Sequence, residues 1–268
     1  MDSEHQPSRK RTVKKRPKNP SNKPNREDVP STPVSTRLNK YIAQSGVCSR
    51  READVLIKSG KIKVNNKVVT EMGYQVVRGD QVHHGSTLLS KEKLIYLLLN
   101  KPKDFITTTD DPQERKTVMQ LISTACEERI YPVGRLDRNT TGVLLFTNDG
   151  ELSKKLTHPS HEVSKIYHVE IDKPMEEEHF EKIKSGIVLE DGEVKVDDIA
   201  ILNKVGIDLG VEIHSGKNRI VRRIFESFGY TVAKLDRVMF AGLTKKDLPR
   251  GKWRMLKEKE IIKLKYLK

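Results

Sequence analysis

The predicted fold depends on residues 134–150, which read G134-R-L-D-R-N-T-T-G-V-L-L-F-T-N-D-G150. The run from Val143 to Phe146 is continuously apolar, which is typical of a short strand covered on both faces. The closing Asn-Asp-Gly supplies residues that tolerate positive φ and predicts a tight reversal. Asp137 is therefore expected just before a rigid strand, beside an irregular loop, where a carboxylate is held firmly and still meets a ligand.

Taken alone, Asp137 is a weak signal. It stands between Arg135 and Arg138, and this pattern also fits a local ion pair or a turn residue. The choice between catalysis and local structure rests on the rest of the chain.

The charge of the chain narrows the class of partner. The 268 residues include 51 basic and 37 acidic side chains, a net charge of +14. Such an excess favours polyanions, either nucleic acid or an anionic membrane. No apolar run reaches the length of a membrane span, and no lipidation motif or basic amphipathic helix stands out. Nucleic acid is the better prediction.

Two cysteines, Cys48 and Cys126, have no paired spacing. Zinc sites and disulfide frameworks are therefore poorly supported, and the reducing cytoplasm is the expected compartment.

Residues 1–35 are predicted to form a disordered basic tail. They hold six of the twelve prolines, no aromatic residue, and nine basic against four acidic side chains. Such a segment buries too little apolar surface to offset the entropy of ordering. It is either a solvated tail or an arm that raises RNA affinity non-specifically; we favour a mild form of the second.

Residues 36–82 are predicted to form a small helix–helix–hairpin unit. Leu38, Tyr41 and Ile42 share a helical face, and Ser49-Arg-Arg-Glu52 fits a capping box for a second helix. Two short strands then flank a turn at Asn65-Asn66.

This unit, T36-R-L-N-K-Y-I-A-Q-S-G-V-C-S-R-R-E-A-D54 through G60-K-I-K-V-N-N-K-V-V69, resembles the S4 RNA-binding domain. The resemblance implies an RNA-docking surface and no chemistry. Its basic side chains are taken together as a patch that faces phosphate: Arg37, Lys40, Arg50, Arg51, Lys58 and Lys61.

A linker is predicted at residues 83–93, followed by a second domain at 94–268. Within it, residues 163–171 alternate as a strand that places Lys165 and Tyr167 on one side. A tyrosine among valines is usually packed in the core, but the lysine on the same side argues against a wholly apolar environment for this face of the strand.

Residues 214–230 form the second informative stretch, H214-S-G-K-N-R-I-V-R-R-I-F-E-S-F-G-Y230. The pattern predicts a helix capped by Asn218 and ended by Gly229, with one apolar face. Arg222 and Arg223 lie at the two margins of that face, and periodicity alone does not choose between them. The basic residues near the start of this helix, which include Lys217 and Arg219, either bind a phosphate oxygen or form a solvated basic face of the helix.

Together, these motifs resemble the ribosomal RNA pseudouridine synthases of the branch that carries an N-terminal S4 domain. The resemblance rests on the 134–150 stretch, on K165-I-Y, on G216-K-N-R-I-V-R-R-I-F-E-S-F-G-Y, and on the later L235-D-R and L248-P-R-G-K-W. It implies that a uridine in folded RNA loses its N1 glycosidic bond and that the base rejoins through C5. Neither a cofactor nor a metal is required.

The resemblance also implies roles for single residues. Asp137 matches the family's catalytic aspartate, either as a nucleophile or as the base that removes a ribose proton. Tyr167 matches the tyrosine that stacks on the target base, and Arg222 the arginine that pairs with the carboxylate. Arg135 matches the arginine that fills the gap left by the flipped uridine. Lys165, Lys217, Arg219 and Arg223 are predicted to bind RNA.

The resemblance and the pattern of many strands with few helices predict an α+β fold. An S4-like domain is followed by a catalytic domain on a mixed, largely antiparallel sheet. The expected partner is ribosomal RNA, free or in pre-ribosomal particles, with large-subunit RNA preferred by resemblance alone; the default oligomeric state is a monomer.

Two rival functions are weighed against this one. A non-catalytic RNA-binding ribosome-assembly factor does not require the trio Asp137, Tyr167 and Arg222. A methyltransferase needs a cofactor loop at a strand–helix turn, and no convincing Gly-x-Gly-x-x-Gly, the signature of a bound nucleotide cofactor, appears.

Overall fold

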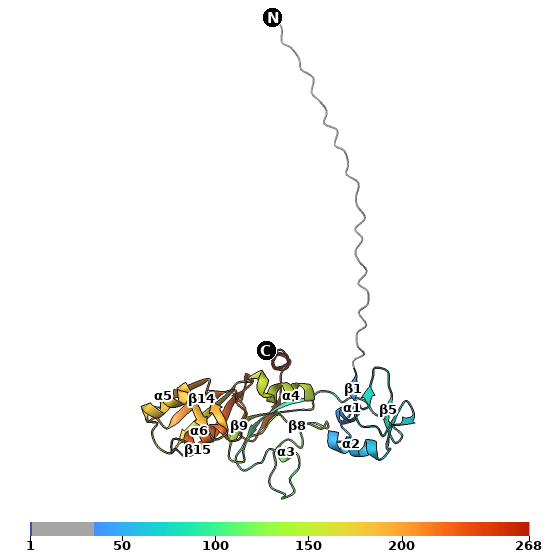
Figure 1. Ribbon diagram of the computed structural model, residues 1–268, viewed down its shortest axis with the longest axis horizontal. Coiled ribbons are helices and arrows are strands. Elements are labelled where there is room, and N and C mark those ends of the chain that lie inside the picture. The colour runs from blue at the N-terminus through green and yellow to red at the C-terminus, as the bar shows by residue number, and fades with distance from the viewer. Residues whose placement is uncertain (2–34, 268) are drawn as a thin grey trace.

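The computed structural model describes Met1 and residues 35–267 (Figure 1). The predicted tail lies outside the described residues, apart from its two ends. The described chain forms a small N-terminal unit joined by a short linker to a larger domain. None of the described helices has the length and apolarity needed to cross a membrane.

The N-terminal unit packs two helices against short strands. Its elements are β1 (Thr36–Arg37), α1 (Leu38–Gln44), α2 (Arg50–Lys58), β2 (Ile62–Val64), β3 (Lys67–Val68), β4 (Gln75–Val76), β5 (Val82–His84) and β6 (Thr87–Leu88). Four of these strands form a sheet in the order β3-β2-β5-β6, and β1 and β4 form a separate two-stranded sheet. Asn65 and Asn66 take φ of 51° and 65° between β2 and β3, as the predicted hairpin requires.

The capping box that begins α2 is confirmed. Ser49 Oγ accepts from the amide of Glu52 at 3.2 Å, and the Glu52 carboxylate accepts from the amide of Ser49 at 2.6 Å. Each bond satisfies an amide that the helix itself leaves without an acceptor.

Ser49→Ala should therefore lower the local stability of α2 by about 1 kcal/mol. Hydrogen exchange of the α2 amides measures the change, and Ser90→Ala, an exposed serine outside the helices, is the control. Equal exchange in the two variants would show that the cap contributes nothing.

Strand pairing in the N-terminal unit continues past residue 82. His83 and His84 lie in β5, which pairs with β2, and Leu89 is buried in the core of the N-terminal unit. Ordered strands of this unit, β5 and β6, therefore extend into the residues predicted as a linker.

The larger domain is built on one nine-stranded sheet. Its central path runs β13-β14-β10-β15-β9-β7-β17, with β16 on β15 and β8 on β9. The strands are β7 (Tyr96–Lys101), β8 (Tyr131–Pro132), β9 (Thr141–Thr147), β10 (Lys165–Ile171), β13 (Asp198–Ile201), β14 (Asp208–Ile213), β15 (Val232–Phe240), β16 (Leu243–Thr244) and β17 (Trp253–Met255). All pairings are antiparallel except that of β9 with β15, so the predicted mixed, largely antiparallel α+β fold is confirmed.

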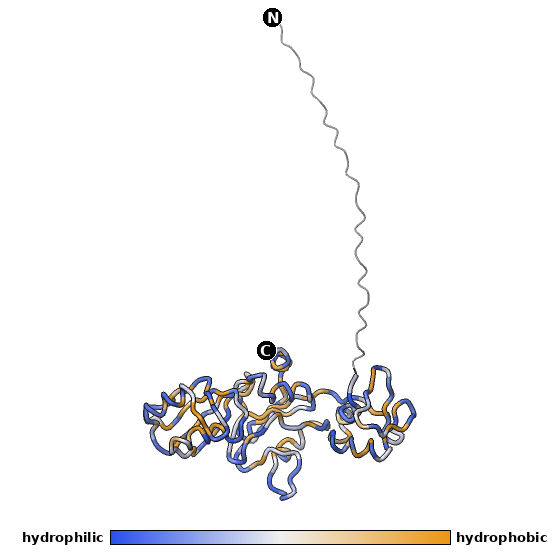
Figure 2. The backbone as a smooth tube through the Cα atoms, in the orientation of Figure 1, coloured by the Kyte–Doolittle hydropathy of each residue, from blue (hydrophilic) through white to orange (hydrophobic). Residues whose placement is uncertain are grey.

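Helices cover both faces of this sheet. They are α3 (Val118–Leu121), α4 (Gly150–Thr157), a 3-10 turn (Pro159–His161), α5 (Glu177–Ser185), α6 (Ile220–Glu226) and α7 (Glu258–Lys265), with a separate hairpin of β11 (Ile187–Leu189) and β12 (Gly192–Val194). Leu144 and Phe146 of β9 enter one core with α6, whereas Val143 and Leu145 enter a second core with α4. Burial on both sides explains the continuous apolar run, and Figure 2 shows the apolar segments gathered inside the domain.

Two local predictions are wrong. Asn148-Asp149-Gly150 forms no positive-φ reversal: Asp149 caps α4 by accepting from the amide of Leu152 at 3.1 Å. Asn218 does not cap α6 either, because Arg219 occupies that position in the left-handed conformation, with φ 45°. Short polar residues serve both turns and caps, so tertiary packing decides which one forms.

Candidate active site

Two segments far apart in sequence meet where β9 and β15 run parallel. Asp236 pairs with Thr141, and Arg237 with Gly142. Gly142 has φ +107°, and a Cβ at this position would lie 2.1 Å from the carbonyl oxygen of Arg237. Only glycine permits this close approach of the two strands.

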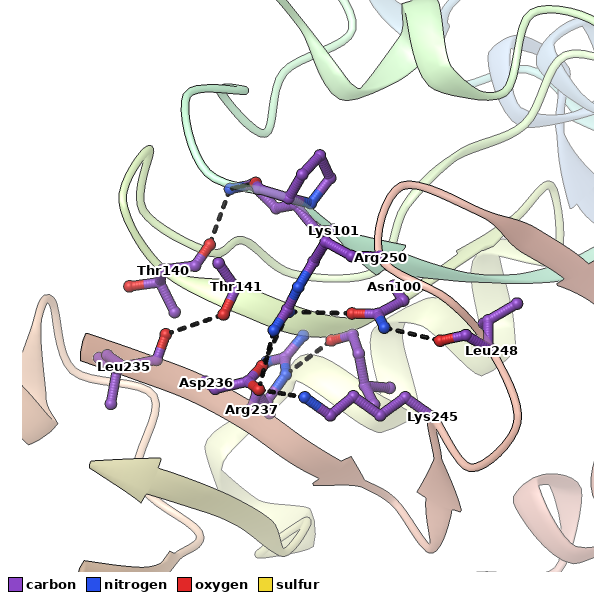
Figure 3. A network of polar contacts seen from close by, with 12 residues as sticks. Asn100, Lys101, Thr140, Thr141, Leu235, Asp236, Arg237, Lys245, Leu248 and Arg250 are labelled. Carbon is purple, nitrogen blue, oxygen red and sulfur yellow. Dashed lines mark hydrogen bonds and ion pairs between the residues drawn. The ribbon is translucent and has the colours of Figure 1, made fainter. Parts of the chain in front are cut away.

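The loop that carries Asp137 is fixed through its backbone. Thr107 Oγ1 donates to the carbonyl oxygen of Leu136 at 2.8 Å. The ammonium of Lys101, a fully buried side chain, donates to the carbonyl oxygens of Asp137, Arg138 and Thr140 at 3.0, 3.2 and 2.8 Å. Figure 3 shows Lys101 reaching Thr140 from the neighbouring strand. The position of Asp137 is therefore set by buried hydrogen bonds that leave its carboxylate free.

Lys101 retains a buried positive charge beside this loop. Burial, only partly offset by the carboxylates of Asp137 and Asp104, lowers the pKa of Lys101 to about 8. A neutral buried polar group is costly unless it is hydrogen-bonded, and a charged one more so. The carbonyl oxygens supply that compensation.

A second polar network holds the C-terminal segment against the parallel pair of β9 and β15 (Figure 3). Arg250 binds the Asp236 carboxylate through both of its terminal nitrogens at 3.1 and 3.2 Å and donates to Asn100 Oδ1 at 3.0 Å. Lys245 forms a further ion pair with Asp236. These bonds lower the pKa of Asp236 although its burial raises it, so the carboxylate stays charged.

A cleft of about 190 Å³ opens beside the parallel pair of β9 and β15. Asp137 lines both this cleft and an adjoining hollow of about 550 Å³. Six predicted site residues line the first cleft: Arg135, Asp137, Lys165, Tyr167, Lys217 and Arg219. They come from the 134–140 loop, from β10 and from the segment before α6. The fold thus gathers three separate sequence motifs around one cavity.

Tyr167 is buried, with 9% of its surface exposed, and it forms a cross-strand pair with Arg237 of β15. Lys165 lies on the same side of β10, as strand alternation predicts. An aromatic ring and a carboxylate, Asp137, therefore share the cleft wall. This combination suits a flat base stacked beside its sugar.

Arg222 is buried and does not line the cleft. Its Nη1 donates to the carbonyl oxygen of Val232 at 2.9 Å. Burial lowers the pKa of Arg222, as does Arg219, while Asp137 raises it. The two groups are near enough to interact, yet the salt bridges among the described residues do not include this pair. In this structure the predicted partners Arg222 and Asp137 therefore lie near each other without forming a salt bridge.

Arg223 is held by another acid. Its guanidinium binds both oxygens of Asp191, in the turn between β11 and β12, at 2.6 and 2.9 Å. Lys217 donates to the carbonyl oxygen of the same Asp191 at 2.9 Å. The pair orders the hairpin beside the cleft, so RNA would have to compete with Asp191 for Arg223.

The basic residues of the N-terminal unit lie away from this cleft. Five of the six residues of the predicted patch are exposed, and none of these five has a carboxylate within 4.0 Å among the residues described. They are Arg37, Arg50, Arg51, Lys58 and Lys61. Lys40 differs, because it forms an ion pair with Glu151 of α4 and so ties the two units together.

Sequence reasoning missed Lys101 and Arg237. Lys101 ends an apolar strand before a proline, and this position signals only a strand end. Arg237 was noted in the L235-D-R motif without a role. In the part of the chain that the structure covers, no group of three His, Cys, Asp or Glu could hold one metal ion.

Comparison with known families matches both parts of the chain. A model of the RNA pseudouridylate synthase family matches residues 95–227, and a model of the S4 domain matches residues 36–82. Ribosomal large subunit pseudouridine synthase B of Bacillus subtilis is 41% identical over 235 residues, covering 86% of this chain and 96% of that protein.

Other relatives agree. The dual-specificity RNA pseudouridine synthase RluF of Escherichia coli is 35% identical over 233 residues, covering 86% of this chain and 78% of that protein. A crystal structure of a pseudouridylate synthase superposes with a TM-score of 0.61 at 29% identity, covering 86% of this chain and 100% of that one.

Proposed function

Because this chain belongs to the RNA pseudouridylate synthase family and carries an S4 domain, we propose that it converts a specific uridine of large-subunit ribosomal RNA to pseudouridine. Family membership makes it an isomerase. The choice of large-subunit RNA is supported by the name of the Bacillus subtilis relative. The proposed place of action is the cytoplasm, where ribosomal RNA is handled, and the proposed working form is a monomer.

One observation carries the mechanism: Asp137 stands on a backbone-fixed loop, in a cleft that also holds Tyr167, and its carboxylate has no salt-bridge partner among the described residues. The target uridine leaves the RNA stack and lies against Tyr167, because the reacting atoms are out of reach inside a helix. Arg135, exposed at the cleft mouth, occupies the vacated place. Arg222 is near enough to Asp137 for the two charges to interact.

Asp137 then acts on the ribose of the bound uridine. It either attacks C1′ or removes the proton from C2′, and both routes break the C1′–N1 bond. The base turns and C5 bonds to C1′. In the first route this bond displaces the Asp137 carboxylate from C1′; in the second route the proton taken from C2′ returns to C2′ as the bond forms. The hydrogen on C5 is then released as a proton, and N1 is protonated. The atoms balance within the substrate, as an isomerisation requires.

Tritium release tests the proposal. Ribosomal RNA labelled at uridine C5, free and in ribosomal particles, is incubated with the enzyme, and tritium in water is counted. Release that saturates at about one tritium for each target uridine supports the proposal. RNA binding without release from any substrate would favour the non-catalytic assembly factor. Release from small-subunit RNA alone would refute the choice of large-subunit RNA.

The RNA is proposed to contact two basic surfaces. Lys217 and Arg219 lie at the rim shared by the cleft and the adjoining hollow. The exposed arginines of the N-terminal unit, including Arg50 and Arg51 at the start of α2, form the second surface. Phosphate contacts of this kind position the RNA and do not read its sequence.

Deleting residues 1–34, of which 2–34 lie outside the described part of the chain, should weaken RNA binding by roughly tenfold at low salt and much less at high salt. Each basic residue that meets phosphate displaces a condensed cation, which is why salt removes the benefit. Filter binding across a salt series measures the effect, and single-turnover rates at saturating enzyme serve as the control. Unchanged affinity at low salt would contradict a binding role for the tail.

A further inference from the structure

Arg237 brings an uncompensated positive charge to the cleft. Its side chain is 3% exposed, and its Nε donates to the carbonyl oxygen of Val143 at 2.9 Å. The guanidinium lies over the ring of Phe240, with 4.6 Å from its carbon to the ring centroid. Its buried Nη2 has no hydrogen-bond partner among the described residues. Such groups are rare because an unpaired buried donor is costly, which indicates a site that a ligand completes.

Lys165 adds a second cation to the same wall. Its ammonium donates to the carbonyl oxygens of Val163 and His214 at 2.9 and 2.6 Å, which leaves one N–H without a recorded acceptor. Burial and the charge of Arg237, against an opposing effect of Asp197, together lower the pKa of Lys165 to about 8. Asp197 is itself hydrogen-bonded to His214.

No acid in the described chain neutralises either group. The salt bridges within 4.0 Å include neither Lys165 nor Arg237. Thr140 Oγ1, on the same cleft wall, is also buried without a partner. A hydroxyl without a hydrogen-bond partner and two cations without a paired acid among the described residues, beside Asp137, form a site for a small anion or for a group that becomes one.

We infer that Lys165 and Arg237 bind the uracil ring and stabilise the negative charge that it carries after leaving C1′. This inference rests on the proposed function. When the C1′–N1 bond breaks, its electron pair departs with the base and spreads over N1, O2 and O4. The same pair forms the new C1′–C5 bond, so the charge exists only between the two steps. Donors aimed at a charge that develops during reaction accelerate it without tightening substrate binding.

The location favours the base over a phosphate of the RNA backbone. Phosphates are large and strongly hydrated, and they fit the exposed rim where Arg135 and Arg219 lie. Arg237 is enclosed and forms the cross-strand pair with Tyr167, the residue proposed to stack on the base. A charge placed there meets the carbonyl oxygens of the ring.

The test compares Arg237→Met and Lys165→Met with Lys234→Met. Lys234 lies on β15 with Arg237, but it is exposed and paired with Glu170, outside the cleft. Each cleft variant should lower the single-turnover rate of tritium release by about 100-fold. The affinity for RNA should change by less than about threefold, because the charge does not exist in the ground state. The control should match the wild type.

A second substrate separates charge stabilisation from a structural role. RNA with 5-fluorouridine at the target position releases a more stable base anion, so its glycosidic cleavage depends less on the two cations. The rate loss for cleavage of this RNA, measured by nuclease digestion and chromatography, should fall to about tenfold or less. An equal loss on both substrates overturns the inference, as does a loss of RNA affinity with an unchanged rate, which would assign the cations to a phosphate.

The wild type and Lys234→Met keep the two proposals distinguishable. If neither releases tritium from any RNA, the proposed function fails. If both do and the cleft variants match them, only this inference fails. Lys165→Met provides the measurement should Arg237→Met not fold, because Lys165 is only half-buried and bonds two backbone carbonyls.

Discussion

Replacing Asp137 by asparagine is expected to lower tritium release by at least roughly 10⁴-fold, because the reaction needs an ionised carboxylate at the ribose and an amide neither attacks C1′ nor accepts the C2′ proton. The fold should survive this change. The loop is held by Lys101 and Thr107 through backbone oxygens, and the side chain of Asp137 forms no hydrogen bond with the described residues. RNA affinity should therefore stay within a few-fold of the wild type.

The matched control is Asp198→Asn, on the edge strand β13 outside the cleft. It removes one carboxylate from the same domain and should leave the rate unchanged. Single-turnover rates, binding titrations and thermal unfolding are measured for both variants. Residual release above a tenth of the wild-type rate would show that another group performs the step assigned to Asp137.

Lys101→Met should reduce both stability and activity. The methionine fills most of the buried volume but donates nothing, so the carbonyl oxygens of Asp137, Arg138 and Thr140 lose their common donor. Loss of a buried charged donor of this kind costs about 3 kcal/mol of unfolding free energy. The loop is expected to shift so that these carbonyl oxygens bind water, and this shift displaces the Asp137 carboxylate. The displacement should lower the single-turnover rate by roughly 100-fold, as small misplacements at a reacting centre do.

Urea unfolding and single-turnover rates, both at low temperature, measure these two effects. Lys103→Met is the control: it lies two residues away, is exposed, and forms none of the recorded side-chain hydrogen bonds. A stable Lys101→Met enzyme with a normal rate would show that Thr107 and the chain itself are enough to place Asp137.

The sequence by itself determined the elements that local chemistry specifies. The continuous run in β9, the capping box at Ser49 and the hairpin at Asn65-Asn66 form as predicted, because each depends on neighbours within a few residues. The motifs also sufficed to predict the family and the two-domain α+β organisation. Local chemistry failed at Asp149 and Asn218, where one short polar residue fits a turn, a cap or neither.

The tertiary structure alone decided which charges are buried and what they meet. Arg222, Arg223 and Arg237 look alike in a sequence. The fold bonds the first to the carbonyl oxygen of Val232, joins the second to Asp191, and leaves the third without a paired acid among the described residues. Lys101 becomes the support of Asp137 only because β7 lies beside β9. The role of a buried charge depends on atoms tens of residues away along the chain, since burial and hydrogen bonding set its energy and both are properties of the packed fold.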